Sequence, residues 1–301
     1  MKVNPQGNII ISCSNDSTIR LWNNTVQGHS QVIKAHTAPV SSISISHSGE
    51  LLLSGGHDKH LKIHRIADRK FVSKLDGHNH WIHSASWAPD TRLIVSGSED
   101  KSVKLWDFSS ETLLQTFNDH IGSVNSVKFH PDGTCIASGS EDKTIKIWDI
   151  RSQRLIQHYD AHSNPCNDIE FHSNGRYLLS ASDDSSIKIW DLRQGHILYT
   201  LYGHEGPSTS VSFSPNGDYF CTGGADSVVM VWKSNLDENE QEFIEDFGAK
   251  VGEPASVPQP AVPKRPTTSK KNVPSRLVTA KKADSPSKSE PAAQQDNYYQ
   301  P

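Results

Sequence analysis

The chain has 301 residues, a formal net charge of −4, 34% hydrophobic residues and 21% charged residues. This balance is typical of a globular protein and gives no general attraction to nucleic acid or to a membrane surface. No stretch approaches about 18 consecutive apolar residues, and no apolar signal-peptide segment follows Met1. We therefore expect a cytoplasmic protein that binds neither nucleic acid nor membrane.

The four cysteines are spread over the chain and form no C-x-x-C pair; they are Cys13, Cys135, Cys166 and Cys221. Such spacing, without a secretory signal, is typical of reduced thiols packed within strands. The sequence also contains no glycine-rich phosphate loop and no histidine cluster with metal-ligand spacing. We expect no zinc site, no redox centre and no cofactor.

Residues 1–236 consist of units that repeat every 42 residues. Four residue types keep this spacing. The aspartates are Asp16, Asp58, Asp100, Asp142, Asp184 and Asp226, and the histidines are His36, His78, His120, His162 and His204. The hydroxyl residues are Ser12, Ser54, Ser96, Ser138, Ser180 and Thr222, and the tryptophans are Trp22, Trp106, Trp148, Trp190 and Trp232. A period of about 40–45 residues with a closing Trp-Asp indicates the WD repeat, in which each unit forms a four-stranded propeller blade.

Each unit has the pattern of short strands joined by turns. In the unit 120–160, the expected strands are 123–129, 135–139, 144–149 and 154–159, and His130–Gly133 forms a turn. No segment of 1–236 has apolar residues at helical spacing over ten or more positions. The predicted fold class is therefore all-β, a WD-repeat β-propeller.

Six units are visible, and both outer units are incomplete. The segment 1–5 aligns with 127–131, so the chain begins inside the first strand of a blade. After Trp232 the sequence turns acidic, and no fourth strand is evident. Because propellers usually close by pairing strands from both ends, two interpretations stay open. One is a six-bladed or gapped ring; the other, which we favour, is a seven-bladed propeller that has lost its beginning.

The composition changes after residue 236, so we predict a propeller at 1–236 and a disordered tail at 237–301. Residues 237–246 hold six acidic side chains and no basic one, whereas residues 250–301 hold nine Lys or Arg against four Asp or Glu. A Pro- and Ser-rich segment of this kind cannot bury enough apolar surface to order itself. It is either a solvated tail without a dedicated partner or a basic attachment to an acidic surface such as a microtubule, which phosphorylation of Ser285 would weaken.

The repeated Ser, His and Asp residues resemble a hydrolytic set, but the set recurs in several units. An enzyme needs one site rather than one in each blade. We expect a structural network, with the aspartate accepting from the histidine, the histidine engaging the hydroxyl, and the hydroxyl meeting the indole N–H. In the second unit, His64 replaces the tryptophan and Gly56 replaces a serine. We expect that blade to be packed less tightly, with the imidazole still donating a hydrogen bond.

If the repeated residues are scaffold, function belongs to positions that vary between units but keep their place. Two such positions lie at the rim of the central channel in WD-repeat proteins. The first is occupied by Ser41, His83, Asn125, Asn167 and Thr209, and the second by Asn15, His57, Glu99, Glu141, Asp183 and Ala225. Consecutive acidic residues with Trp81 beside them predict a rim that binds a basic peptide, or else carboxylates that only keep the face hydrated.

Three segments outside the repeated positions carry a closer resemblance: Arg154–Tyr159, His196–Pro207 and Val229–Asn235. Together with the repeat they resemble the centriolar WD-repeat family known as proteome of centriole protein one, from Met1 to about Asp237. The resemblance implies a seven-bladed propeller at centrioles and basal bodies, centriolar protein partners, and a role in centriole stability, microtubule integrity and cilium formation. It also implies a C-terminal coiled coil, but no heptad pattern occurs before Pro301.

Two alternatives of other classes stay open. Arg151 and Arg193 each complete a W-D-x-R sequence, in successive units, and that motif resembles the one by which substrate receptors dock to a cullin-RING ubiquitin ligase adaptor. An arginine at this place is also an ordinary strand-end residue. A generic signalling scaffold fits the repeat equally, whereas an enzyme is the least supported class.

Overall fold

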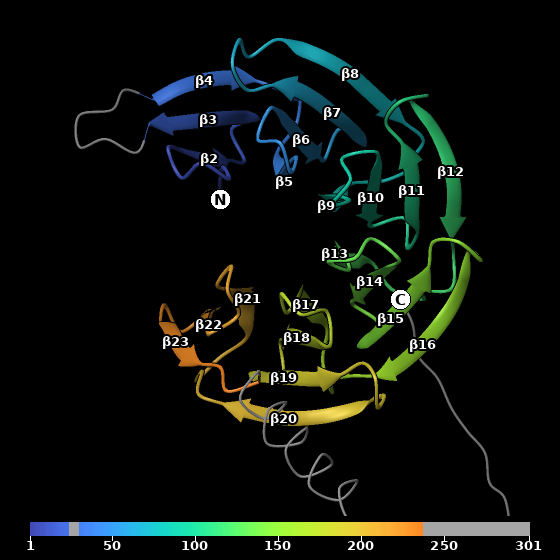
Figure 1. The fold of residues 1–301 in the computed structure, drawn as a ribbon, viewed down its shortest axis with the longest axis vertical. Helices are drawn as coiled ribbons and strands as arrows, with labels where there is room; N and C mark the ends of the chain where they lie inside the picture. Colours follow the sequence, from blue (N-terminus) through green and yellow to red (C-terminus); the bar gives the residue numbers. More distant parts are fainter. Residues whose placement is uncertain (24–29, 237–301) are drawn as a thin grey trace, which may run out of the picture. The chain divides into compact units, whose positions relative to one another are not determined.

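The computed structural model describes residues 1–23 and 30–236, all within the first of the chain's two units, Met1–Ala249. These residues form 23 strands in six antiparallel sheets, with no helix in either range. The sheets surround a common centre, and one strand of each sheet lies innermost (Figure 1). The predicted all-β WD-repeat propeller is thereby confirmed. The expected tail at 237–301, with its acidic and basic segments, lies outside the described residues.

The strands of each sheet are paired in sequence order. Sheet A contains β1 (Lys2–Val3), β2 (Ile9–Cys13), β3 (Thr18–Asn23) and β4 (Ser30–Lys34). Sheet B contains β5 (Val40–Ile45), β6 (Leu51–Gly56), β7 (His60–Arg65) and β8 (Phe71–Asp76). Sheet C contains β9 (Ile82–Trp87), β10 (Leu93–Ser98), β11 (Val103–Asp107) and β12 (Thr112–Phe117). Sheet D contains β13 (Val124–Phe129), β14 (Cys135–Ser140), β15 (Thr144–Asp149) and β16 (Arg154–Asp160). Sheet E contains β17 (Cys166–Phe171), β18 (Tyr177–Ser182), β19 (Ser186–Asp191) and β20 (His196–Tyr202). Sheet F contains β21 (Ser208–Phe213), β22 (Tyr219–Gly224) and β23 (Val229–Lys233).

The turn between the two middle strands explains why the aspartate repeats. In sheet D, Asp142 Oδ1 accepts from the backbone N–H and the hydroxyl of Thr144, at 3.0 and 2.6 Å. The residue after the aspartate has a left-handed backbone in every unit; these residues are Ser17, Lys59, Lys101, Lys143, Ser185 and Ser227. Because a carboxylate that bonds the backbone two residues ahead stabilises such a turn, the aspartate sets the hairpin that joins the middle strands.

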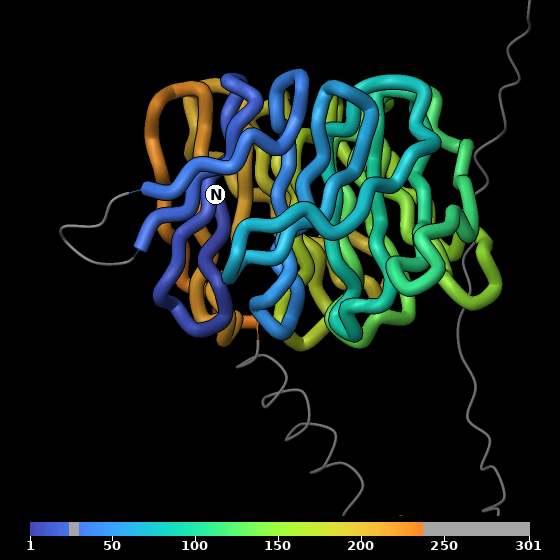
Figure 2. Tube along the Cα trace, turned by 90° about the horizontal axis from the view of Figure 1, so that it is seen from above, coloured from blue at the N-terminus to red at the C-terminus, as the bar shows by residue number. Residues whose placement is uncertain are grey.

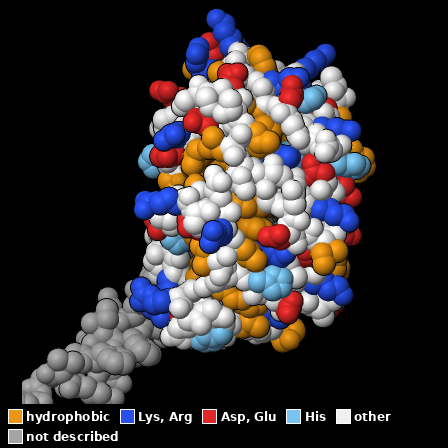
Figure 3. All heavy atoms as spheres, turned by 90° about the vertical axis from the view of Figure 1, so that its right-hand side faces the viewer, with side chains coloured by type: hydrophobic (Ala, Val, Ile, Leu, Met, Phe, Trp, Pro, Cys, Tyr) orange, Lys and Arg blue, Asp and Glu red, His pale blue; other side chains and the backbone are white. Residues whose placement is uncertain are grey.

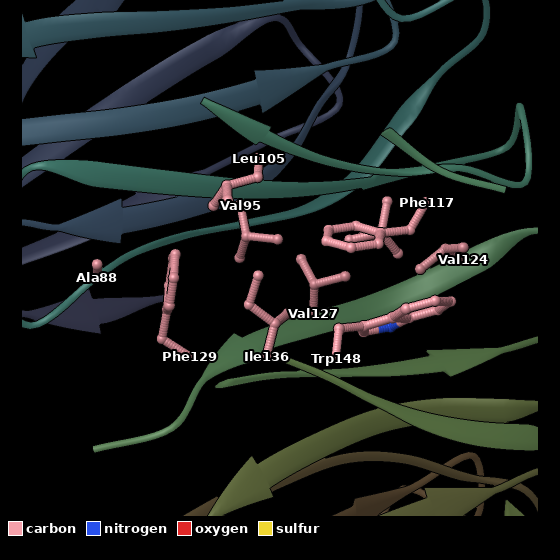
Figure 4. Close-up of a cluster of buried hydrophobic side chains, with 10 residues drawn as sticks. Ala88, Val95, Leu105, Phe117, Val124, Val127, Phe129, Ile136 and Trp148 are labelled. Carbon is pink, nitrogen blue, oxygen red and sulfur yellow. The ribbon is translucent and has the colours of Figure 1, made fainter. Parts of the chain in front are cut away.

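Neighbouring sheets pack face to face. Between sheets C and D, Val95, Leu105 and Phe117 meet Val127 and Trp148 (Figure 4). Strand alternation places every second residue on one face, so each sheet has a back face toward the next sheet and a front face toward the previous one. The same positions, displaced by 42 residues, form the cores between sheets A and B, B and C, D and E, and E and F. The stability of the propeller therefore comes from five repeated junctions.

The two outer units differ from the others as expected. The inner strand of sheet A is the two-residue β1, and the described part of sheet F has three strands. The series of sheets is interrupted between sheet F and sheet A (Figure 1), while the turns of all units gather at two opposite faces (Figure 2). On the side of Figure 3, acidic and basic side chains are interspersed around apolar strips, as the small net charge predicts.

Candidate partner-binding rim

The repeated residues form one hydrogen-bonded chain in each complete unit. In sheet D, Trp148 Nε1 donates to Ser138 Oγ over 2.8 Å. That hydroxyl lies 2.8 Å from His120 Nε2, and His120 Nδ1 lies 2.8 Å from a carboxylate oxygen of Asp142. A neutral imidazole that carries its proton on Nδ1 satisfies every group, because the hydroxyl donates to Nε2 and Nδ1 donates to the carboxylate. The chain ties the loop before β13 to the middle strands of the sheet.

The other units repeat this arrangement with two exceptions. Complete sets are His78 with Ser96, Asp100 and Trp106; His162 with Ser180, Asp184 and Trp190; and His204 with Thr222, Asp226 and Trp232. His36 bonds Asp58 and Ser54 without a tryptophan. Asp16 has no histidine partner in the described ranges. It bonds Thr18 within its turn and pairs with Arg20 at 3.9 Å, while Trp22 donates to Ser12.

Burial and hydrogen bonding fix the charge states of these pairs. Burial lowers the pKa of His78, and hydrogen bonding to Asp100 only partly opposes this effect. For Asp184, burial raises the pKa, but hydrogen bonds from Ser186 and the nearby His162 outweigh it and lower the pKa to about 2. The lowered pKa values mean that Asp184 is ionised and that His36, His78 and His162 are neutral near pH 7.

The networks offer no reactive nucleophile. Ser54, Ser96, Ser138 and Ser180 are completely buried, so no substrate reaches their hydroxyls. No group of three or more His, Cys, Asp or Glu side chains in 1–23 and 30–236 is placed to hold a metal ion. Each network therefore connects a loop to the middle strands of its own blade.

Within the same ranges, no helix is long and apolar enough to cross a membrane.

Sheet B departs from the pattern in a way that the sequence only partly predicts. His64 is buried, and its Nδ1 has no hydrogen-bond partner among the described residues, so this atom does not donate the hydrogen bond that we expected of the imidazole. The ring packs edge-on against Phe71. Burial, followed by the charges of His36 and Lys62, lowers the pKa of His64 to about 4. The imidazole is too short to reach Ser54 as the tryptophan does in other units. This unit therefore has one hydrogen bond fewer than the units that carry the tryptophan.

The rim positions contact one another in pairs. His83 Nε2 lies 2.6 Å from Glu99 Oε2, and Asn167 Nδ2 donates to Asp183 Oδ1 over 2.7 Å. Both pairs join the residue five after the loop histidine to the residue before the turn aspartate of the same unit. The hydrogen bond from His83 is the largest cause of the lowered pKa of Glu99, and Ser123 of the next sheet contributes a further one. Glu99 is therefore an ionised carboxylate, and hydrogen bonds hold both Glu99 and Asp183 in fixed positions.

The remaining rim residues behave differently from one another. Asn125 donates to the Cys166 carbonyl of the next sheet, and Thr209 donates to the Gly223 carbonyl of its own sheet. The carboxylate of Glu141 is exposed at the same face. The eight expected rim residues thus lie on equivalent loops and strand ends, but Glu141 has the most accessible charge.

Trp81 belongs to an aromatic group, and its backbone carbonyl accepts from the N–H of Glu99 at 2.9 Å. It is 44% exposed, and its ring stacks on His57 with 4.6 Å between centroids and 7° between planes. His80 packs on the indole at 5.1 Å, and His83 meets His57 edge-on. Burial and then the charge of His83 lower the pKa of His57. Of this group, the sequence singled out Trp81 and His83, and the rim position also contained His57.

A polar channel site was not expected from the sequence. Lys128 Nζ lies 2.5 Å from Glu170 Oε2, while Asp168 accepts from Ser126 at 2.8 Å and from Ser210 at 3.2 Å. These side chains line a cavity of about 280 Å³ at the centre. A signal was available, because Asp168 stands at a position where the other units carry serine: Ser42, Ser84, Ser126 and Ser210.

The two W-D-x-R arginines are both exposed. Their backbone N–H groups donate to the aspartate of the motif, Arg151 to Asp149 at 3.0 Å and Arg193 to Asp191 at 2.9 Å. Asp191 also accepts from Arg176 at 3.0 Å. The motif therefore forms a turn at the end of β15 and β19, and the guanidinium groups lie on neighbouring sheets.

Comparison with known proteins agrees with the propeller. A WD domain, G-beta repeat model matches residues 1–23, and no curated protein matches the chain. A second family model, described as nucleolar protein 10-like, N-terminal domain, is a β-propeller and matches residues 14–236. This match does not confirm the centriolar resemblance. It covers well over half of the chain and nearly all described strands, and the protein therefore belongs to the family of nucleolar protein 10-like N-terminal β-propeller domains.

Proposed function

We propose that this propeller is a non-catalytic scaffold of centrioles and basal bodies, where it supports centriole assembly, stability and ciliogenesis by binding centriolar proteins. The support for the location is the resemblance of the outer-strand segments Arg154–Tyr159 and His196–Pro207 and of the closing segment Val229–Asn235 to a centriolar family. A WD-repeat propeller is a protein-interaction scaffold, and the exposed residues of the rim are the surface through which it acts.

The rim takes a basic segment of a partner protein. The observation that carries this proposal is the half-exposed indole of Trp81, stacked on His57, at a rim that also carries the ionised Glu99 and the exposed Glu141. An aromatic anchor held in place contributes strongly to binding, since it costs little conformational entropy. The carboxylates select an Arg or Lys side chain and disfavour an acidic peptide.

Peptide binding tests the rim. The probes are a fluorescent Arg-Gly repeat peptide and its Glu-Gly counterpart, measured by anisotropy with the full chain. We expect the basic peptide alone to bind, and Glu99→Ala with Glu141→Ala to weaken it. The matched control is Glu50→Ala with Asp160→Ala, which removes two exposed charges away from the rim pairs. If both double variants weakened peptide binding equally, the loss would come from the change in net charge, and a binding site at the rim would be contradicted.

Localisation tests the centriolar role. A tagged full chain is imaged in dividing and ciliated cells with one marker of the centriole wall and one of the nucleolus. Punctate overlap with the centriole marker supports the proposal. The family model's description favours a second candidate, a nucleolar propeller, and overlap with the nucleolar marker would replace the first.

The exposed arginines favour a third candidate, a substrate receptor of a cullin-RING ubiquitin ligase. Co-purification of the ligase adaptor that is lost in Arg151→Ala with Arg193→Ala would support this function. Arg154→Ala is the matched control, because Arg154 is an exposed arginine at the start of β16 outside the motif. Adaptor binding that is indifferent to the double change would exclude docking through W-D-x-R.

The basic tail is proposed to attach the scaffold to microtubules. The net charge of residues 250–301 is +5, and the microtubule wall is acidic. Co-sedimentation compares the full chain with residues 1–249. We expect the full chain to pellet with microtubules at low salt and to be released by added salt, whereas the shortened chain stays in the supernatant. Equal pelleting of the two would reject the tail as the attachment.

A further inference from the structure

Sheets A and F each present a face that no neighbouring described sheet covers. At the five internal junctions, the back face of one sheet packs on the front face of the next. The back face of sheet F and the front face of sheet A border the interruption in the series of sheets (Figure 1). The 42-residue repeat allows each residue on these two faces to be compared with its equivalents at the junctions.

The back face of sheet F is apolar and exposed. Val229 is 73% exposed, although its equivalents are completely buried; they are Ile19, Leu61, Val103, Ile145 and Ile187. Val231 is 72% exposed, and its equivalents are buried; they are Leu21, Ile63, Leu105, Ile147 and Ile189. Tyr219 on the neighbouring strand is exposed too. Two side chains that are core in every other sheet, Val229 and Val231, therefore meet water, together with Tyr219, whose equivalents are partly buried except for the buried Tyr177.

The front face of sheet A is also apolar and exposed. Met1 is 81% exposed, although the equivalent residues are buried; they are Ile43, Ala85, Val127, Ile169 and Val211. Val3 is 57% exposed, whereas three of its equivalents are buried, Trp87, Phe129 and Phe171, and the other two are partly buried, Ile45 and Phe213. Trp22, equivalent to the buried Trp106 and Trp148, is exposed as well. The front face of sheet A therefore carries the apolar residue types found on the other front faces, but no described sheet packs against it.

The space around one repeated glycine position also shows that the back face of sheet F is uncovered. A Cβ built at Gly97 would lie 2.7 Å from Val124 of the next sheet, and one at Gly139 would lie 2.9 Å from Cys166. The equivalent residue of sheet F is Gly223, where a Cβ would meet nothing within 4 Å. Glycine at this position leaves room for the front face of a following sheet, and in sheet F that room is empty.

Polar groups lack their usual partners too. On the inner strands of sheets B to E, a side chain accepts from a backbone N–H of the next inner strand: Ser42 from Ala85, Ser84 from Val127, Ser126 from Ile169, and Asp168 from Val211. Ser210, the equivalent in sheet F, instead donates backward to Asp168. In addition, β23 pairs with β22 and is the last described strand of sheet F.

We propose that the opening between sheets F and A is a docking site for one antiparallel β-sheet of the same 42-residue pattern, carried by a second polypeptide. Sheet F exposes a back face and sheet A exposes a front face. The occupant therefore needs a front face to pack on sheet F and a back face to pack on sheet A. A single blade of this pattern has both, whereas a helix or a lone strand does not. An outer strand on the partner would also pair with the edge of β23. The surface is independent of the rim.

The test uses the full chain and a copy of its own sequence. Residues 70–126 are duplicated ahead of Met1, followed by a protease site. The duplicate carries an outer strand and one complete blade, and it ends where Met1 continues the register. After folding and cleavage of the site, the duplicate becomes a separate polypeptide. We expect it to co-elute one-to-one with the cleaved chain at about 1 μM, with a higher melting temperature than the chain alone and a blue-shifted Trp22 emission.

Two variants make the result specific. Val229→Lys with Val231→Lys places charges on the back face of sheet F, and we expect the duplicate to dissociate after cleavage. The matched control is Leu113→Lys with Ile121→Lys, which changes two exposed apolar residues elsewhere and should leave the complex intact. Dissociation of the unaltered complex would overturn the proposal, and so would retention of the duplicate by the charged variant. Rim binding of the basic peptide is measured separately and does not depend on either outcome.

Discussion

His120 Nδ1 lies 2.8 Å from a carboxylate oxygen of Asp142, and together these residues tie a loop to the middle hairpin of sheet D. Asp142→Ala removes the acceptor for His120 and the bond that sets the Thr144 turn. We expect a loss of about 1–3 kcal/mol in the free energy of unfolding, measured by urea denaturation. Asp160→Ala, at an exposed outer-strand aspartate, is the control. Equal stability of the two variants would show that the network contributes nothing.

His64 is a site where the repeated residue can be restored. His64→Trp places an indole N–H beside Ser54, as Trp106 lies beside Ser96 at 2.8 Å. It also removes a buried polar atom without a partner. We expect an increase of about 1 kcal/mol in the free energy of unfolding at pH 7.5. His64→Ala should lower it, and a fall on introducing tryptophan would mean that sheet B has repacked around the imidazole.

Acidification should destabilise the protein in two steps. The folded-state pKa of His64 is lowered to about 4, and those of His36, His78 and His162 are lowered as well, so these groups gain protons more readily when unfolded. Their contribution is complete above about pH 6.5 and is lost as the pH falls toward their folded values. The aspartates, with Asp184 at about 2, weaken the fold below about pH 4. Melting temperatures from pH 8 to 3 measure both steps, and His64→Trp should flatten the first.

The junction glycines give a matched pair. Gly97→Ala pushes a methyl group against Val124 and Val127, at 2.7 and 2.9 Å before relaxation. We expect it to cost about 1–3 kcal/mol in thermal or urea unfolding. Gly223→Ala, at the same position of sheet F, should be neutral or slightly stabilising, since nothing lies within 4 Å and alanine restricts the unfolded chain. Similar losses at both positions would contradict the open back face.

Trp81 is expected to be the strongest single contributor to rim binding. Trp81→Ala removes the exposed indole stacked on His57, and we expect the affinity for the Arg-Gly peptide to fall roughly 30-fold, the loss of about 2 kcal/mol usual for an aromatic anchor. Ile156→Ala removes another exposed apolar side chain, on the outer strand β16, and should have little effect. Circular dichroism checks the fold of both variants. An unchanged affinity would move the binding site away from Trp81.

Much of the fold follows from local patterns in the sequence. Alternation of apolar residues defines the strands, and the aspartate followed by a left-handed residue defines the middle turn. Because both signals are local and repeat every 42 residues, the blades and their hydrogen-bonded networks could be predicted with the residues involved. His64 is an instructive exception. The substitution was evident, but the unpartnered Nδ1 depends on the length of the imidazole within a packed sheet.

What the sequence alone determined is the unit: its four-strand pattern, its Asp142-type turn and its His120-type network, since each arises within one or two neighbouring repeats. Only the tertiary structure decided which units meet. The pairing of Lys128 with Glu170, the stacking of Trp81 on His57 and the exposure of Val229 all depend on which sheet follows which around the centre. A repeated residue is buried or exposed according to its neighbour sheet, and no local pattern encodes whether that neighbour is present.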